Sequence, residues 1–162
     1  MSLFDNFIMR KSSATVIDKN RICKRIPHAG DMCLIESVMQ WDKDSITCLS
    51  RTHVDTNNPL RDANKLPVSA LVEYGAQTMA IHGALVNEQC GEHQGGYLAA
   101  LKNVRFYDGD LSNIQEEIII SAKKIYSDGK NMIYDFSVSA IEKELVSGRA
   151  TVFGGDVTGE HL

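Results

Sequence analysis

The sequence has no excess of positive charge. Its 162 residues include 17 Lys and Arg against 21 Asp and Glu, which gives a formal net charge of -4. An electrostatic footprint for nucleic acid is usually a wide basic patch, whereas the local cluster of Arg21, Lys24 and Arg25 is narrow. We therefore expect no nucleic-acid partner, and we interpret these three residues as a solvated helix face.

Long apolar runs are also missing. No run approaches the roughly 20 residues that a membrane helix needs. The first seven residues contain Asp5 and lack the apolar segment of a secretion signal. We therefore predict a cytoplasmic protein that does not contact a membrane.

The four cysteines, Cys23, Cys33, Cys48 and Cys90, include no C-x-x-C pair. Four cysteines allow three disulfide connectivities, and the sequence does not choose among them. Without a secretion signal, reduced thiols are the expected state, some of them in the core. No cluster of histidine, cysteine or acidic residues has metal-ligand spacing, and no glycine-rich phosphate loop occurs. We therefore expect neither a metal nor another cofactor.

The residues that are present indicate one globular domain. Hydrophobic residues make up 43% of the chain and charged residues 23%, which is typical of such domains. The length suffices for one sizeable core. Residues 1–14 show no hydrophobic period and predict a flexible lead-in, so residues 15–162 are predicted to form the domain.

Hydrophobic periodicity predicts one long helix among several strands. Apolar residues recur at helical spacing over residues 67–90, with Pro67 in the first turn and Gly91 after the end. A shorter helix is predicted over residues 15–26, where Pro27 ends it. Alternating patterns predict strands over residues 33–41, 45–53, 96–106, 116–126, 132–141 and 145–153. This order predicts an α+β fold in which one antiparallel sheet curls around the long helix.

Glu73 is the first catalytic candidate. It lies in the most apolar stretch of the chain, and no other charged residue occurs between Val68 and His82. A helix that is apolar on nearly all sides is normally buried, and burial raises the pKa of a carboxyl group towards neutrality. Such a group can transfer protons at physiological pH. Gln77 follows one helical turn later, where it could orient the Glu73 carboxyl or bond across a dimer interface.

Three segments resemble the hotdog-fold 3-hydroxyacyl-acyl-carrier-protein dehydratases of the FabZ and FabA type. Residues 26–38 (IPHAGDMCLIESV) are similar to the family's LPHR-PFLLVDRV segment, and residues 67–77 (PVSALVEYGAQ) to its PGVLxxEAMAQ helix. Residues 103–106 (NVRF) resemble its xARF strand. The PHxGxM and EYxAQ patterns are most similar to the ApeP-like branch, whose members occur with aryl polyene pigment biosynthesis.

The resemblance implies a hotdog fold and a hydro-lyase. Its reaction would convert a 3-hydroxyacyl thioester on an acyl carrier protein into a trans-2-enoyl thioester, in fatty-acid or aryl-polyene-type synthesis. Glu73 would be the acid for the departing hydroxyl, and a backbone N–H near Val68 would donate to the thioester carbonyl.

The resemblance also implies the other residues of the site. Pro27 and Gln77 would contact the substrate. His28, beside the mouth of the acyl tunnel, would be the base, because an imidazole titrates near neutrality. His53 is the alternative base.

One departure from the family pattern keeps two further functions open. FabZ and FabA proteins carry a catalytic histidine fourteen residues before the acid, where this chain has Pro59, and residues 56–61 contain no histidine. The chain could therefore be a catalytically impaired, acyl-binding partner of another hotdog dehydratase, or a hotdog thioesterase. Under each interpretation the exposed edge of the sheet predicts a homodimer or a heterodimer.

Overall fold

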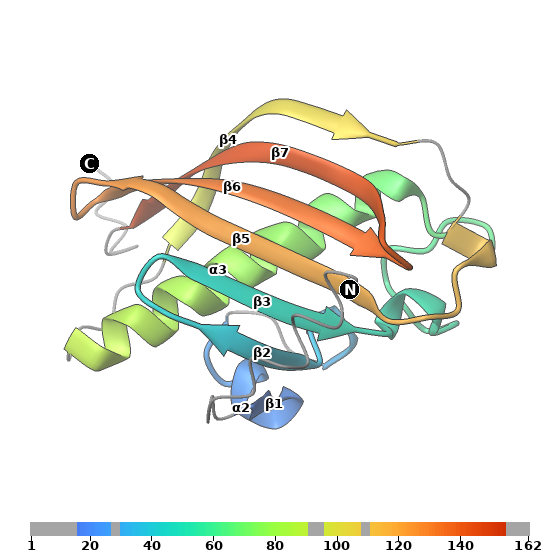
Figure 1. Ribbon diagram of the computed structural model, residues 1–162. Coiled ribbons are helices and arrows are strands. Elements are labelled where there is room, and N and C mark those ends of the chain that lie inside the picture. Colours follow the sequence, from blue (N-terminus) through green and yellow to red (C-terminus); the bar gives the residue numbers. More distant parts are fainter. Residues whose placement is uncertain (1–15, 27–29, 91–95, 108–110, 155–162) are drawn as a thin grey trace, which may run out of the picture.

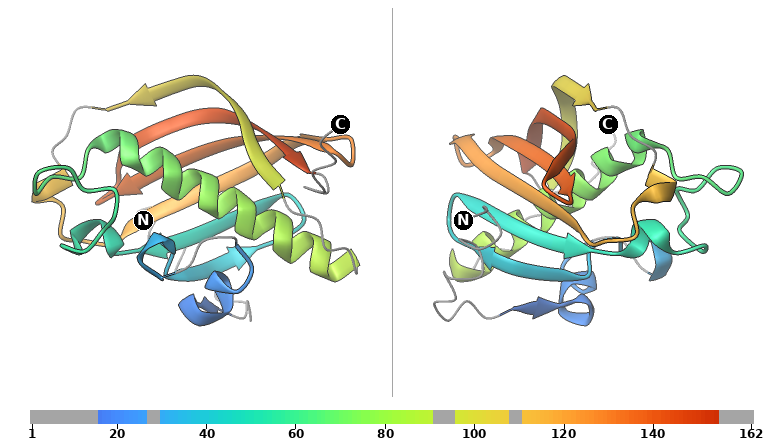
Figure 2. Two further views of the ribbon diagram at one scale, coloured as in Figure 1. Left: turned by 180° about the vertical axis from the view of Figure 1, so that it is seen from behind. Right: turned by 45° about the vertical axis from the view of Figure 1, so that its right-hand side comes forward.

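The computed structural model describes residues 16–26, 30–90, 96–107 and 111–154. Within these residues, seven strands pair antiparallel in one sheet of order β1-β2-β3-β5-β6-β7-β4. Helix α3 crosses one face of this sheet, and the sheet curves around it (Figures 1 and 2). The α+β architecture predicted from the sequence is confirmed.

The order of the elements follows the predicted order closely. The helices and strands are β1 Ile17–Asp18, α2 Lys19–Cys23, β2 Ser37–Trp41, β3 Ser45–Ser50, α3 Leu71–Cys90, β4 Gly96–Phe106, β5 Ile118–Ser127, β6 Asn131–Ala140 and β7 Lys143–Gly154. Short 3₁₀ turns occupy Gly30–Met32, Thr52–Val54, Val68–Ala70 and Leu111–Asn113. None of the helices in the described part of the chain has the length and apolar character that a membrane span requires.

The N-terminal part differs from its prediction. The helix expected over residues 15–26 is shorter, because β1 precedes it and adds a seventh strand to the sheet. The Asp18 side chain caps α2 by accepting a hydrogen bond from the Arg21 N–H at 3.0 Å. β2 begins at Ser37 rather than at residue 33, because side chains bind the backbone of Leu34 in place of a neighbouring strand.

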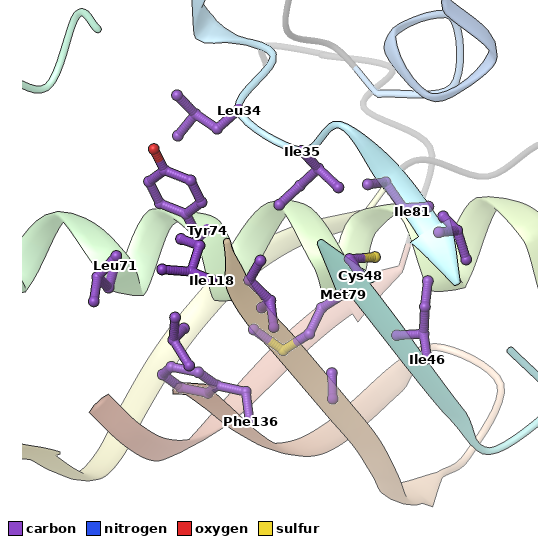
Figure 3. Close-up of a cluster of buried hydrophobic side chains, with 14 of the residues drawn as sticks. Leu34, Ile35, Ile46, Cys48, Leu71, Tyr74, Met79, Ile81, Ile118 and Phe136 are labelled. Atoms are coloured by element: carbon purple, nitrogen blue, oxygen red, sulfur yellow. The ribbon is translucent and has the colours of Figure 1, made fainter. Parts of the chain in front are cut away.

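The core lies between α3 and the concave face of the sheet. The alternation predicted for β6 is confirmed, since Tyr134, Phe136, Val138 and Ala140 are all buried. Figure 3 shows Ile118 and Phe136 of the sheet facing α3 near Leu71. The helix lies close to the sheet at Gly75, where a Cβ would lie 2.6 Å from Cδ2 of Phe136. A larger residue at this position would force the helix and the sheet apart.

His82 joins the second half of α3 to the sheet. Its ring is fully buried. Nε2 donates to the Asp42 carbonyl in the β2–β3 turn at 2.7 Å, and Nδ1 accepts from the Tyr134 hydroxyl on β6 at 2.7 Å. Burial lowers the pKa of His82, so the imidazole is neutral. His82 is therefore a core residue of the helix, with both ring nitrogens in use.

The structure corrects the expectation of reduced thiols for one pair. Cys23 and Cys33, ten residues apart in sequence, form a disulfide with their Cα atoms 5.8 Å apart. This bond joins α2 to the segment that precedes β2. Cys48 is free and buried, and burial raises the pKa of its thiol to about 12. Cys48 therefore belongs to the core, in agreement with the expectation that some of the cysteines are buried, reduced thiols.

We expect the free energy of unfolding to fall as the pH drops below about 6.5, the ordinary pKa of histidine. The pKa of His82 is lowered in the folded state, so the unfolded chain binds the proton first. The stabilising contribution is full above the unfolded pKa and is lost as the pH falls towards the folded pKa. Urea unfolding at about pH 7.5 and about pH 5 measures this loss. Both pH values lie above the range in which carboxylates such as Asp42 titrate. His82→Gln should reduce the loss, and equal stability of the wild type at both pH values would contradict the expectation.

Cys23→Ser should lower the free energy of unfolding by about 3 kcal/mol, because a disulfide that closes a ten-residue loop restricts the unfolded chain. Denaturant unfolding with and without dithiothreitol measures the effect. The reductant should destabilise the wild type by a similar amount and leave Cys23→Ser unchanged. A wild-type protein with the same stability under both conditions would show that this bond does not form or does not stabilise the fold.

Candidate functional site

Gln77 binds the first part of α3 to the segment before β2. Its side chain is only 1% exposed. Oε1 accepts from the Leu34 N–H at 2.9 Å, while Nε2 donates to the Met32 carbonyl at 2.7 Å and to Oε1 of Glu73 at 3.2 Å. One amide therefore holds the backbone at two residues and the carboxylate of Glu73 at the same time.

Glu73 is half-buried, so the expectation of complete burial is wrong. The half-buried positions of α3 recur at helical spacing, and most are small: Val72, Glu73, Ala76, Ala80, Gly83, Ala84, Val86 and Asn87. Glu73 can therefore be reached from outside the chain, as a group that meets a substrate or a partner must be.

Tyr74 links the loop between β3 and α3 to the helix. Its fully buried hydroxyl accepts from Nδ2 of Asn58 at 3.0 Å and shares a 2.8 Å hydrogen bond with Oγ1 of Thr52. Thr52 donates its own hydroxyl proton to the Leu34 carbonyl at 2.8 Å, so Tyr74 is the donor to Thr52. Figure 3 shows the Tyr74 ring directed from α3 towards Leu34. Burial raises the pKa of Tyr74, which therefore acts as a neutral anchor.

Arg61 closes the same loop at its outer side. Its guanidinium donates to the carbonyls of His53 at 3.1 Å, Asp55 at 2.7 Å and Asn64 at 3.1 Å. The loop with Pro59 at the family's histidine position is therefore a well-bonded element.

The histidine candidates occupy different environments. His53 is 2% exposed, and its Nε2 donates to the Ile114 carbonyl at 3.1 Å. No atom of the described residues bonds its Nδ1. Burial lowers the pKa of His53, so the ring is neutral and lies between the loop and the β4–β5 connection. His28 and Pro27 lie outside the described residues.

Val68 lies in the turn that begins the helix and lines an open cleft of about 620 Å³. The other lining residues are Asp62, Ala63, Lys65, Leu66, Pro67 and Leu111. The first N–H groups of a helix have no acceptor within it, and the helix dipole is positive there. This cleft can therefore bind a carbonyl oxygen that gains negative charge. Within the described ranges, no three histidine, cysteine or acidic side chains are grouped to hold a metal ion.

Thr52, Asn58 and Arg61 also determine the site, although the sequence did not predict it. Asn58 and Arg61 lie in a polar loop whose composition indicates solvent exposure, and Thr52 lies in the predicted strand 45–53, which ends at Ser50 in the structure. Thr52 and Asn58 are nevertheless buried. One signal was present: Tyr74 lies in an otherwise apolar helix, and a buried phenol normally finds a hydrogen-bond partner. The identity of that partner could not be read from the sequence.

A protein-family model described as ApeP dehydratase, of the ApeP-like family, matches residues 20–161 of the chain. A comparison with curated proteins found no match.

Several solved structures share the arrangement of the sheet and the helix. The dehydratase heterocomplex ApeI:P from Xenorhabdus doucetiae matches with a TM-score of 0.75 and 20% identity, over 88% of this chain and 93% of that chain. A thioesterase from Haemophilus influenzae matches with a TM-score of 0.60 and 15% identity, over 94% and 98%. The PaaI protein of Escherichia coli, from the phenylacetic acid degradation operon, matches with 0.57 and 10%, over 83% and 88%. Likenesses at such low identity establish the hotdog fold alone.

Gln77→Leu should destabilise the fold by about 3 kcal/mol, because each buried group left without a partner costs about 1–3 kcal/mol. The groups are the Leu34 N–H and the Met32 carbonyl. Denaturant unfolding measures the change. Gln89→Leu, at an exposed position of the same helix, is the control and should change stability by less than about 0.5 kcal/mol. Similar losses in both variants would contradict the role assigned to Gln77.

Proposed function

Because the chain belongs to the ApeP-like dehydratase family, we propose that it acts as one subunit of a two-chain dehydratase for 3-hydroxyacyl thioesters. The substrate would be carried on an acyl carrier protein, in fatty-acid or aryl-polyene-type synthesis, as the sequence resemblance implies. One observation carries the proposal: Glu73 is half-buried in the first turn of α3 and is held there by Gln77.

The proposed reaction divides among three groups. A base removes the proton from the carbon next to the thioester carbonyl, and the electron pair forms the new carbon–carbon double bond. Glu73 in its protonated form gives its proton to the 3-hydroxyl, which leaves as water when the carbon–oxygen bond breaks. The backbone N–H groups near Val68 stabilise the carbonyl oxygen while it carries negative charge. The proton taken by the base restores Glu73 for the next turnover.

His28 is the proposed base. His82 has both ring nitrogens bonded within the core, and His53 is buried against Ile114, so neither suits proton abstraction from a substrate beside Glu73. His28 and Pro27 stand shortly before Met32 in the sequence, and the Gln77 amide that binds Glu73 also binds the Met32 carbonyl.

We propose that a second chain pairs with β4, because β4 is an uncovered edge of the sheet. Ten of its eleven residues are exposed, with Val104 half-buried. A long edge strand with open N–H and C=O groups invites pairing with another strand. The relative from Xenorhabdus doucetiae is described as a heterocomplex. A partner strand along β4 would also bring a second hotdog helix towards the open side of α3.

Glu73→Gln should lower turnover by about 10²- to 10⁴-fold, the usual contribution of a positioned acid. Enoyl absorbance is followed with a 3-hydroxyacyl thioester, using the protein alone and together with the hotdog chain that co-purifies with it. Glu88→Gln is the control, because Glu88 pairs with Arg25 near the other end of α3, and its activity should stay at the wild-type level.

Four outcomes are decisive in this assay. Unchanged turnover in Glu73→Gln refutes the role of Glu73. Loss of turnover in His28→Gln supports His28 as the base. Full turnover of His28→Gln in the two-chain complex assigns the base to the partner and makes this chain the impaired, acyl-binding subunit. Release of free thiol without enoyl product identifies a thioesterase.

A further inference from the structure

The edge strand β4 has two chemically different faces. Strand residues that pair directly share a face of the sheet. Leu98, Leu101 and Phe106 pair with the buried residues Val152, Ala150 and Val146, so they lie on the face towards α3. They are nevertheless 39%, 42% and 52% exposed. This chain therefore leaves the apolar face of its own edge strand uncovered.

The outer face of β4 carries positive charge. Lys102 pairs with Arg149 and Arg105 pairs with Ser147, so both cations lie on the face away from α3. On the same outer face Arg149 bonds Asp135 on β6 at 2.7 and 3.0 Å, and Glu144 lines the hollow that Arg105 also lines. From Gly96 to Phe106 the strand contains no acidic residue. The strand itself therefore carries a formal charge of +2 in a chain whose net charge is -4.

A bulge places the two cations on one face. Residues three apart in a regular strand point to opposite faces. Between Lys102 and Arg105 the register with β7 shifts, and Asn103 adopts a positive φ of 53°. This extra residue returns Arg105 to the outer face beside Lys102. Bulges and lysines on edge strands are devices by which proteins restrict indiscriminate strand pairing.

A second copy of this chain would meet its own charge at this edge. Two copies of β4 can pair as antiparallel strands related by a two-fold axis. If the axis lies at any residue from Leu101, the midpoint of β4, to Phe106, a cation of one strand lies within two residues of a cation of the other. That separation is about 7 Å along the strand, inside the Debye length of about 10 Å at 0.1 M salt. Like charges on directly opposed strands are destabilising.

We infer that Lys102 and Arg105 select the partner chain: they oppose pairing of β4 with a second copy and favour a hotdog chain whose edge strand carries carboxylates. This inference rests on the two-chain assembly of the proposed function. The apolar face of β4 supplies the driving force for association, because any partner covers Leu98, Leu101 and Phe106. The charged face supplies the discrimination, because it distinguishes among partners that cover the apolar face equally well.

A charge-swap experiment tests this selection with the full chain. Wild type is mixed with Lys102→Glu/Arg105→Glu, and native mass spectrometry counts the two homodimers and the mixed dimer. At about 50 mM salt the mixed dimer should clearly exceed its statistical share of half, and the excess should shrink at about 0.5 M salt as screening increases. A 1:2:1 distribution at low salt, or no mixed dimer at all, would overturn the inference.

A matched control separates local charge from total charge. Lys43→Glu/Lys130→Glu makes the same change in two exposed turns, and its mixed dimer with wild type should stay at half. An equal excess in this control would also overturn the inference, because the effect would then come from net charge.

A neutral variant gives an independent measurement. Lys102→Gln/Arg105→Gln removes the repulsion without adding attraction, so its self-association by sedimentation should be about fivefold tighter than that of the wild type. Unchanged self-association would overturn the inference. None of these readouts uses turnover, so a failed dehydratase assay leaves them intact. Statistical mixing would refute partner selection and leave the chemistry of Glu73 standing.

Discussion

The hydrogen bonds to the backbone N–H and carbonyl of Leu34 hold the candidate site together. The N–H donates to Gln77, and the carbonyl accepts from the hydroxyls of Ser50 and Thr52. Both backbone groups are buried, so each would carry a large desolvation cost without these side chains. The helix, the end of β3 and the segment before β2 therefore meet at one residue. Loss of the Gln77 bond leaves the Leu34 N–H unpaired in the interior, whereas the carbonyl is left unpaired only when both hydroxyl bonds are lost.

Two sets of hydrogen bonds extend from the partners of Leu34 into the site. Gln77 in turn binds Glu73, whose half-buried carboxylate it holds at 3.2 Å. Thr52 binds Tyr74, which also binds Asn58, and these residues fix the loop where related dehydratases carry a histidine. The loop that contains Pro59 therefore has a defined structure although it carries no histidine. The same fold can position an acid and yet depend on another segment, or another chain, for the base.

One chain leaves part of its own apolar surface uncovered. The sheet wraps α3 on one side only, and the apolar face of the edge strand β4 is exposed. In the proposed two-chain assembly, a partner strand along β4 would cover this apolar face. Under the same proposal that partner would also approach Glu73, which would link the choice of partner to catalysis.

The sequence by itself determined the order of the elements, the α+β class and the identity of the acidic candidate. Periodicity predicted α3 and the last three strands because each buries one face, and a buried face leaves a regular apolar pattern. It also predicted β4, which has an apolar face that this chain leaves uncovered. It also predicted the contact between Glu73 and Gln77, since residues four apart on a helix are neighbours. The start of β2, the Cys23–Cys33 disulfide and the half-burial of Glu73 were decided only by the tertiary structure. The physical reason is that each depends on groups far apart in the chain: Gln77 reaches Leu34 across 43 residues, and the uncovered side of α3 exists only once the sheet has curved around the other.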